Sequence, residues 1–229
     1  MRAIVGAAMI VAVAVAAMAE PPKGEGWEPL FNGKDFAGWK LPEKAKGHWT
    51  VKDGVMDYDA KAGTTLWTEA SFGDFVLHIE WRMKTAKELY GSEVDENGKP
   101  YRFAPDSGIF LRGTAKAQTN IWPNPMGSGE VWGYRTDKKM PQEIRDACVP
   151  KVRADKPLGE WNVQEITMKG EHLTVVLNGH EVIDTDLPGI KPQGPIGLQH
   201  HGGFDAKTGR WKPASSCIQF RNVYIKKLK

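Results

Sequence analysis

The strongest constraint on this chain is a series of strand-like segments in its last third. Within residues 171–183, the dipeptide Asn178-Gly179 lies between two β-rich runs and supplies the two positive φ values that a tight hairpin turn requires. Similar segments cover residues 159–168, 194–202 and 218–225. The pattern predicts an all-β sandwich of antiparallel strands and argues against a helical bundle.

Residues 75–83 show the clearest alternation of apolar and polar side chains. One face of the expected strand carries Phe75, Leu77, Ile79, Trp81 and Met83, and the other carries Val76, His78, Glu80 and Arg82. Because successive side chains of a strand point to opposite faces, we expect the first set in the core and the second on a polar surface. Residues 107–112 and 117–122 are expected to form two further strands, with Gln118 and Asn120 on one face.

Residues 1–19 are typical of an export signal. Arg2 gives a positive start, residues 4–17 are almost wholly apolar, and Ala17-Met18-Ala19 matches a cleavage site. Since the apolar run is shorter than the roughly 20 residues that span a bilayer, we expect cleavage, a periplasmic or extracellular location and no stable membrane insertion. Residues 20–229 then suit one β-sandwich domain.

Charge and cysteine content limit the partners of the chain. The formal net charge is +3, and loss of Arg2 with the signal lowers it to +2, which is too small to indicate a nucleic-acid partner. Cys148 and Cys217 lack metal-type spacing, and in an oxidising compartment they form either a disulfide or two buried thiols. No cofactor motif is present in the sequence, so we expect no cofactor, with a divalent ion left open.

Two long stretches, residues 85–106 and 123–158, interrupt the strand pattern, and the second contains one expected short helix over residues 141–147. Connections of this length inside a compact domain are uncommon and are usually functional or disordered. We therefore expect both stretches to form walls of a binding site.

Seven short motifs occur in an order that resembles the 3-keto-disaccharide hydrolase family. They are LFNGKDFAGW at 30–39, FVLHIEWR at 75–82, SGIFLR at 107–112, GEWN at 159–162, LNG at 177–179, IGLQ at 196–199 with HG at 201–202, and FRN at 220–222. The resemblance covers residues 27–228. It implies a concanavalin A-like lectin/glucanase jelly roll whose concave sheet holds a carbohydrate, and cleavage of glycosides that carry a ketone at C3 of the sugar.

The chain departs from the family pattern at two places. Many relatives have a carboxylate where this chain has Gln118, with Asn120 two residues later, and an acid where this chain has His200. A glutamine cannot act as a base near neutral pH. Either the catalytic groups are redistributed or the activity is altered.

The implied reaction requires a base, a group that stabilises an enolate and an acid for the leaving oxygen, because the ketone acidifies the C2 proton. His201, at the family's late histidine position, is the expected base or acid, and the alternative is a histidine that only hydrogen-bonds a loop. His200 points to the opposite face if the strand is regular, so we expect only one of the two to be catalytic. We assign His200 and Gln199 to substrate binding.

Three further residues are expected to be catalytic. Glu80 and Arg112 are assigned as a carboxylate and an enolate-binding guanidinium, with Arg82 binding substrate beside them. Glu130, on the second long stretch, is assigned as a replacement for the missing strand carboxylate. The alternatives are a surface ion pair for Glu80 and Arg82 and an exposed loop acid for Glu130.

The remaining predicted substrate contacts are polar or aromatic. Gln118 and Asn120 suit sugar hydroxyls, although they also suit a cross-strand amide ladder. Trp122 and Trp132 offer flat faces for a pyranose ring, and Lys151 is a further candidate.

Two other functions stay open at this point. A carbohydrate-binding module without catalysis would use the same fold and would explain the missing carboxylate. A conventional glycoside hydrolase would need two acids about 5 to 9.5 Å apart, and the chain has no acid-x-x-acid strand of the glucanase kind. The enzyme hypothesis requires His201, Glu80, Arg112 and Gln118 to line one cavity.

Overall fold

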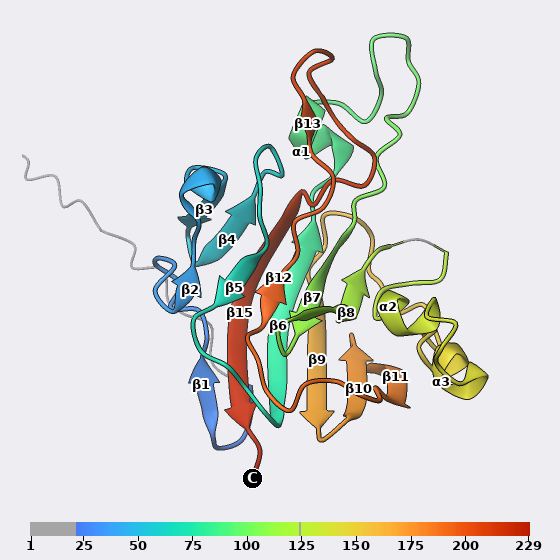
Figure 1. The fold of residues 1–229 in the computed structure, drawn as a ribbon. Coiled ribbons are helices and arrows are strands. Elements are labelled where there is room, and N and C mark those ends of the chain that lie inside the picture. Colours follow the sequence, from blue (N-terminus) through green and yellow to red (C-terminus); the bar gives the residue numbers. More distant parts are fainter. Residues whose placement is uncertain (1–21, 124) are drawn as a thin grey trace, which may run out of the picture.

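Two antiparallel sheets pack face to face in a computed structural model, which describes residues 22–123 and 125–229. The larger sheet has the order β11-β10-β9-β6-β15-β4-β3, with β1 also pairing with β15, and the smaller sheet has the order β2-β5-β12-β7-β8 (Figure 1). The predicted antiparallel β-sandwich is confirmed. The predicted signal peptide and its cleavage site lie outside the described residues.

The strands and helices have the following bounds. The larger sheet contains β1 (Trp27–Pro29), β3 (Trp49–Lys52), β4 (Val55–Tyr58), β6 (Phe75–Met83), β9 (Asn162–Lys169), β10 (His172–Leu177), β11 (His180–Asp186) and β15 (Ile218–Lys227). The smaller sheet contains β2 (Trp39–Lys40), β5 (Leu66–Thr68), β7 (Ser107–Leu111), β8 (Thr114–Ile121) and β12 (Gly197–Leu198), and a separate hairpin pairs β13 (Phe204–Asp205) with β14 (Arg210–Trp211). The helices are α1 (Ala86–Tyr90), α2 (Trp132–Arg135) and α3 (Gln142–Ala147), and Glu43–Ala45 form a 3-10 turn.

Local sequence explains the clearest of these elements. Along β6 the residues alternate between buried and half-buried, starting from buried Phe75, as the apolar pattern predicts. Asn178 and Gly179 join β10 to β11 with φ values of 51° and 84°, so this turn has the positive φ at both positions that the dipeptide predicts. Among the described residues, no helix is both long and apolar enough to cross a membrane.

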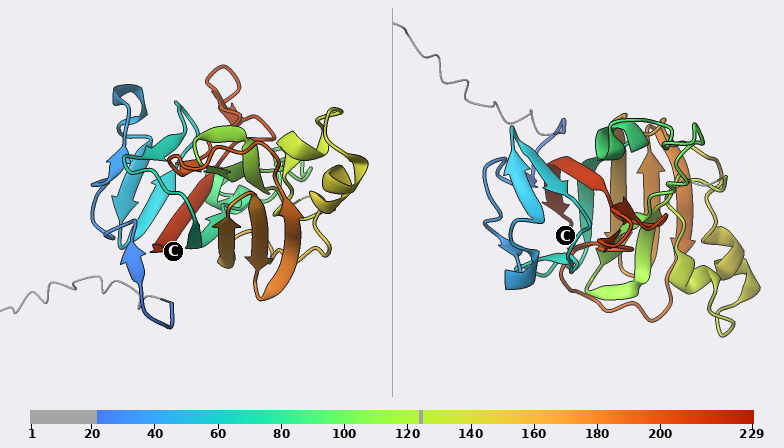
Figure 2. Two further views of the ribbon diagram at one scale, coloured as in Figure 1. Left: turned by 60° about the horizontal axis from the view of Figure 1, so that its bottom comes forward. Right: turned by 90° about the horizontal axis from the view of Figure 1, so that it is seen from above.

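The core fills the space between the two sheets. Trp81 and Phe220 of the larger sheet belong to the same buried cluster as Ile109, Ile121 and Leu198 of the smaller sheet. Because neighbouring side chains alternate, the polar residues of β6 point away from this core, to the far side of the larger sheet. The two layers are visible in the views of Figure 2.

The first long connection lies at one end of the sandwich, at the top of Figure 1. In the first, Thr85 and Glu88 form a capping box that starts α1, and an aromatic cluster then ties this connection to the β13–β14 hairpin. Tyr90 stacks on Tyr101 with 4.1 Å between ring centroids and meets Trp211 edge-on at 5.4 Å. Figure 1 shows α1 and β13 close together. The aromatic cluster holds the chain that leads into β7 against the loop that follows β12.

The second long connection contains two short helices beside β8 and β11, although only one was expected from the sequence. The predicted helix corresponds to α3. A Cβ on Gly133 of α2 would lie 2.4 Å from the carbonyl oxygen of Lys116, so α2 packs directly against β8.

Cys148, at the end of α3, and Cys217 are both buried free thiols, and burial raises the pKa of each to about 12.

Arg112 lies in the turn between β7 and β8, where it is 1% exposed. Its guanidinium donates to the carbonyl oxygens of Gly73 (2.9 Å), Gly170 (2.7 Å) and Lys191 (3.1 Å) and pairs with Asp74 at 2.9 Å. Arg112 thus joins three separate loops. The expectation that it lines a sugar site with His201 is wrong, because protein groups already take up its Nε, Nη1 and Nη2 atoms.

We expect Arg112→Lys to lower the free energy of unfolding by about 2 to 4 kcal/mol, because a lysine ammonium cannot reach three carbonyl groups and a carboxylate in the same geometry. Denaturant unfolding followed by fluorescence measures this loss. Arg102→Lys, at an exposed position, should stay within about 0.5 kcal/mol of the unchanged protein. Equal stability of the two variants would contradict the structural role of Arg112.

Candidate active site

A groove of about 400 Å³ lies on the outward face of the smaller sheet. Its lining residues come from β7 and the residue before it, β8 and the residue after it, α2 and the loop after β12. They are Asp106, Phe110, Ala115, Gln118, Asn120, Trp122, Trp132, Gln199 and His201. Six of them were predicted from the sequence, namely His201, Gln118, Asn120, Trp122, Trp132 and Gln199. Because β8 directs Ala117 and Ile121 into the core, Gln118 and Asn120 between them face the groove.

The floor of the groove is a chain of side-chain amides. Nε2 of Gln118 donates to Oδ1 of Asn120 at 2.5 Å and to Oε1 of Gln199 at 2.7 Å, and it lies 3.3 Å from the carbonyl oxygen of Ser107. Gln118 lies over Gly108, where a Cβ would come within 2.2 Å of Nε2. A larger residue at Gly108 would push Gln118 out of the floor.

Two groups that can only accept hydrogen bonds determine which end of each side-chain amide faces its neighbour. Nδ2 of Asn120 donates to Oε2 of Glu130 at 3.3 Å, so Oδ1 of Asn120 must face Gln118. The carbonyl of Ser107 likewise requires the NH2 group of Gln118. Oε1 of Gln199 accepts from Gln118, and Nε2 of Gln199 is therefore available to a ligand as a donor.

Glu130 lies beneath the groove floor and is 1% exposed. Its Oε1 atom accepts from Nε of Arg135, and its Oε2 atom accepts from Asn120. The prediction that Glu130 replaces the missing strand carboxylate is therefore wrong in position, because Glu130 can contact a ligand only through Asn120. The expectation of an exposed loop acid is also wrong.

The hydrogen bonding of His201 determines its neutral tautomer. Its Nδ1 atom lies 2.8 Å from the carbonyl oxygen of Ala214, which can only accept, so Nδ1 carries the proton. In the neutral imidazole, Nε2 then has a free electron pair and can accept a proton. His201 both hydrogen-bonds a loop and lines the groove.

Asp106 was not selected from the sequence, although it lines the groove beside His201. Its Oδ2 atom lies 3.8 Å from Nδ1 of His201, and its buried Oδ1 atom has no hydrogen-bond partner within the described chain. The pKa of Asp106 is raised from 3.8 to about 6, chiefly by burial, with His201 opposing the shift and the charge of Glu130 adding to it. The available signal was the position of Asp106, at the end of a long connection and directly before the SGIFLR strand.

Glu80 and Arg82 lie on the opposite side of the molecule, on the outward face of the larger sheet. Glu80 accepts from Arg221 and from Asn222, both at 2.7 Å. Arg82 donates to Gln219 at 2.7 Å and pairs with Glu88 at 2.9 Å. The expectation that these residues converge with His201 is wrong, because the polar face of β6 is turned away from the smaller sheet.

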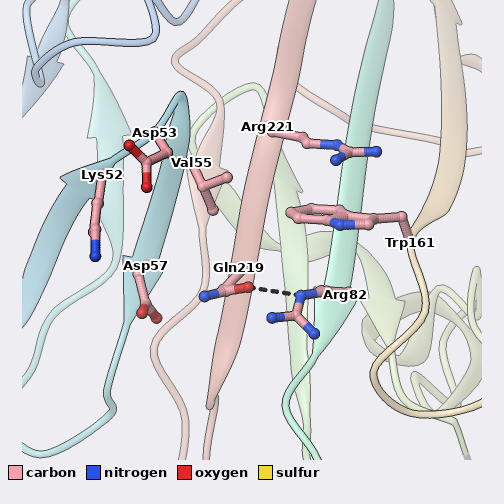
Figure 3. Close-up of a pocket in the computed structure, with 8 residues that line it drawn as sticks. All are labelled: Lys52, Asp53, Val55, Asp57, Arg82, Trp161, Gln219 and Arg221. Carbon is pink, nitrogen blue, oxygen red and sulfur yellow. Dashed lines mark hydrogen bonds between the residues drawn. The ribbon is translucent and has the colours of Figure 1, made fainter. Parts of the chain in front are cut away.

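The outward face of the larger sheet has a hollow of its own, about 330 Å³ in volume, beside Trp161. Figure 3 shows the ring of Trp161 between Arg221 and Arg82, whose guanidinium carbons lie 4.1 and 5.7 Å from its centroid. Both ring faces are covered by guanidinium groups, so this tryptophan has no free face for a sugar ring.

His200 and Lys151 also lie outside the groove. Nδ1 of His200 hydrogen-bonds the hydroxyl of Tyr58, and burial lowers the pKa of His200. The assignment of His200 to substrate binding is therefore wrong, although His200 and His201 do point in different directions, as expected. Lys151 pairs with Glu181 at 2.5 Å beside β11, so the structure contradicts its expected place near the substrate. Across the described residues, no cluster of three or more histidine, cysteine or acidic side chains is arranged to hold a metal ion.

Comparisons with known proteins agree with this fold. A family model described as the 3-keto-alpha-glucoside-1,2-lyase-like domain matches residues 26–226. A crystal structure of a candidate glycosyl hydrolase from Parabacteroides distasonis ATCC 8503 has 26% identity and a TM-score of 0.58, covering 89% of this chain and 84% of that one. A second from the same organism has 19% identity and a TM-score of 0.57, covering 90% of this chain and 95% of its own. No curated protein matches the chain.

We expect Asp106→Asn to raise the free energy of unfolding above that of the unchanged protein at pH 7. This gain should exceed the gain at pH 3.5 by about 1 to 3 kcal/mol. The pKa of Asp106 rises from 3.8 to about 6 on folding, so the folded chain loses stability as the pH rises between these values. An asparagine has no charge to bury and avoids this loss. Denaturant unfolding at the two pH values measures it.

The matched control is Asp53→Asn, which removes an exposed carboxylate on the β3–β4 hairpin. This variant should follow the pH dependence of the unchanged protein. If Asp106→Asn also shows the pH dependence of the unchanged protein, burial does not raise the pKa of Asp106.

Proposed function

Because the chain belongs to the 3-keto-alpha-glucoside-1,2-lyase-like domain family, we propose that it cleaves glycosides that carry a ketone at C3 of the sugar ring, in the groove on the smaller sheet. The family supports a carbohydrate-active role, as does the similarity to a candidate glycosyl hydrolase at 26% identity. Glu80 and Arg112 lie away from His201 and Gln118, so the set of four residues that the sequence-based hypothesis required is not formed. The finer proposal is carried instead by the pair of Asp106 and His201 in the groove.

The first step is removal of the C2 proton by Nε2 of His201. The electron pair of the C2–H bond forms an enolate with the C3 carbonyl, whose oxygen becomes negative. Nε2 of Gln199 is available to donate a hydrogen bond to this oxygen, because the amide chain directs its NH2 group away from Gln118. A donor aimed at developing charge stabilises the transition state more than the ground state.

The second step expels the group at C1. The enolate re-forms the C3 carbonyl, a C1–C2 double bond forms, and the C1–O bond breaks as its electrons pass to the leaving oxygen. Asp106 supplies the proton to that oxygen, and its pKa of about 6 leaves part of the population protonated near neutral pH. Water then adds at C1 and gives one proton to the carboxylate of Asp106, while His201 returns its proton to C2, so both groups regain their starting protonation states.

The other groove residues hold the sugar ring. Trp132 is 53% exposed and begins α2, so its ring can cover one face of a pyranose. Oε1 of Gln118 and Nδ2 of Asn120 can accept from and donate to sugar hydroxyls.

The two alternative functions fit the groove less well. A conventional glycoside hydrolase needs two carboxylates across the sugar, and Asp106 is the single acid among the described residues that line the groove. A module that only binds carbohydrate has no use for an unpaired buried carboxyl oxygen next to a histidine, since burying a polar group without a partner costs free energy.

We expect purified protein to release the aglycone from 3-keto-glycosides, and His201→Ala to reduce the rate about 100-fold to 10,000-fold. The rate should fall as the pH rises above about 6, because Asp106 loses the proton that it donates. Asp106→Asn should be slow and should lack this decline. Tight glycan binding without turnover, unaffected by either substitution, would favour the binding module.

Gln199→Glu should lower kcat about 100-fold or more while changing KM less. The glutamate keeps an oxygen for Gln118 to donate to, but it places a negative acceptor where Nε2 stabilises the enolate. Gln219→Glu makes the same chemical change on the far face of the larger sheet, beside Arg82, and should retain full activity. Steady-state kinetics on one 3-keto-glycoside compares the two, and equal rates would remove Gln199 from the mechanism.

A further inference from the structure

A second hollow of about 380 Å³ adjoins the groove, and we propose that it binds a flat, apolar leaving group that carries a negative charge. Its walls are mostly apolar, and its rim is positive. The residues that carry the argument are Phe103, Trp122, Pro157, Leu158, Arg153 and Lys156. The role of this molecule as a leaving group rests on the proposed function, whereas its binding does not. We refer to this hollow as the aglycone hollow.

Two features connect the aglycone hollow to the groove. Trp122 lines both, so its side chain forms a wall between them. Pro105 lines the aglycone hollow, and the next residue, Asp106, lines the groove. The acid of the proposed mechanism therefore lies at the border, where the bond to the leaving oxygen must be broken. A sugar in the groove would extend its C1 substituent past Asp106 into the aglycone hollow.

The walls of the aglycone hollow favour an apolar ring over a second sugar. Phe103 and Trp122 provide aromatic surface, and Leu158 is exposed there. The described lining also contains four prolines, at positions 105, 123, 125 and 157. Proline has no backbone N–H and no polar side-chain atom. Sugar hydroxyls would lose hydrogen bonds to water at these walls without replacement, which is unfavourable. An aromatic ring would instead gain apolar contact.

The charge at the rim indicates an anionic substituent. Arg153 and Lys156 line the aglycone hollow, and no carboxylate is among its described lining residues. The ammonium of Lys156 donates to the neutral carbonyl of Trp161 at 3.0 Å, which leaves its charge uncompensated. Asp155, between these two cations in sequence, is engaged by Ser128 at 2.9 Å. A carboxylate or sulfate on the leaving group would complement both cations.

The test is direct binding by isothermal titration calorimetry with 4-hydroxybenzoate as the probe. The neutral analogue 4-hydroxybenzyl alcohol and the disaccharide trehalose serve as comparisons. We expect 4-hydroxybenzoate to bind more tightly than either comparison. The double variant Arg153→Gln and Lys156→Gln should weaken binding of 4-hydroxybenzoate about tenfold or more and should change that of the neutral alcohol less than about twofold.

Two further variants separate apolar from electrostatic effects. Leu158→Asn should weaken both aromatic probes, because it removes apolar wall surface at an exposed position where folding tolerates change. Lys138→Gln removes a positive charge from the same long connection outside the aglycone hollow, and it should leave all binding unchanged. Trehalose binding as tight as that of 4-hydroxybenzoate, no binding of 4-hydroxybenzoate, or the same loss in Lys138→Gln as in the double variant would each overturn the proposal.

His201→Ala distinguishes this proposal from the proposed function. That variant should bind 4-hydroxybenzoate as well as the unchanged protein does, even though it cannot turn over substrate. If the binding pattern holds and no 3-keto-glycoside is cleaved, the aglycone hollow stands and the catalytic proposal fails. If 3-keto-glycosides are cleaved with no preference for an anionic aryl leaving group and 4-hydroxybenzoate does not bind, the catalytic proposal stands and the proposal for the aglycone hollow fails.

Discussion

The packing of two apolar sheet faces against each other is the constraint on which the rest of the structure depends. Side chains alternate along every strand, so burying Trp81 of the larger sheet against Ile109 and Ile121 of the smaller one fixes the direction of all their neighbours. The polar residues of the two sheets then point outward in opposite directions. Because packed sheets lie about 10 Å apart, the whole thickness of the sandwich separates the two polar faces. Glu80 and Gln118 therefore belong to different surfaces, whatever chemistry their side chains could share.

Under the proposed function, loop residues supply the acid and the base that the strand residues Gln118 and Asn120 cannot. Gln118 is part of a hydrogen-bonded amide chain whose direction is fixed by the carboxylate of Glu130, which comes from the long connection after β8. Glu130 orients donors in the groove while staying below its floor. In the proposed reaction, Asp106 serves as the acid and His201 as the base. Both belong to the connections that are held together by the aromatic cluster of Tyr90, Tyr101 and Trp211.

The pattern of the sequence predicted the parts of the fold that depend on neighbouring residues. The alternation of residues 75–83, the hairpin at Asn178-Gly179 and the shared face of Gln118 and Asn120 are all confirmed. The role of Arg112 was misjudged, because its partners are carbonyl groups of three loops far away in sequence. Contacts with loops that are distant in sequence cannot be predicted from a local pattern of residues.

The order of residues was enough to predict the main strands, several of their turns and the face of each strand on which a given residue lies, since these follow from a repeat of two residues along an extended chain. Which polar face becomes a groove depends on which loops cover it, and the packing of loops is a property of the whole folded chain. The same packing places Asp106 beside His201 with a buried Oδ1 atom that has no hydrogen-bond partner among the described residues. That contact joins two loops distant in sequence, and only the packing of the whole chain brings them together.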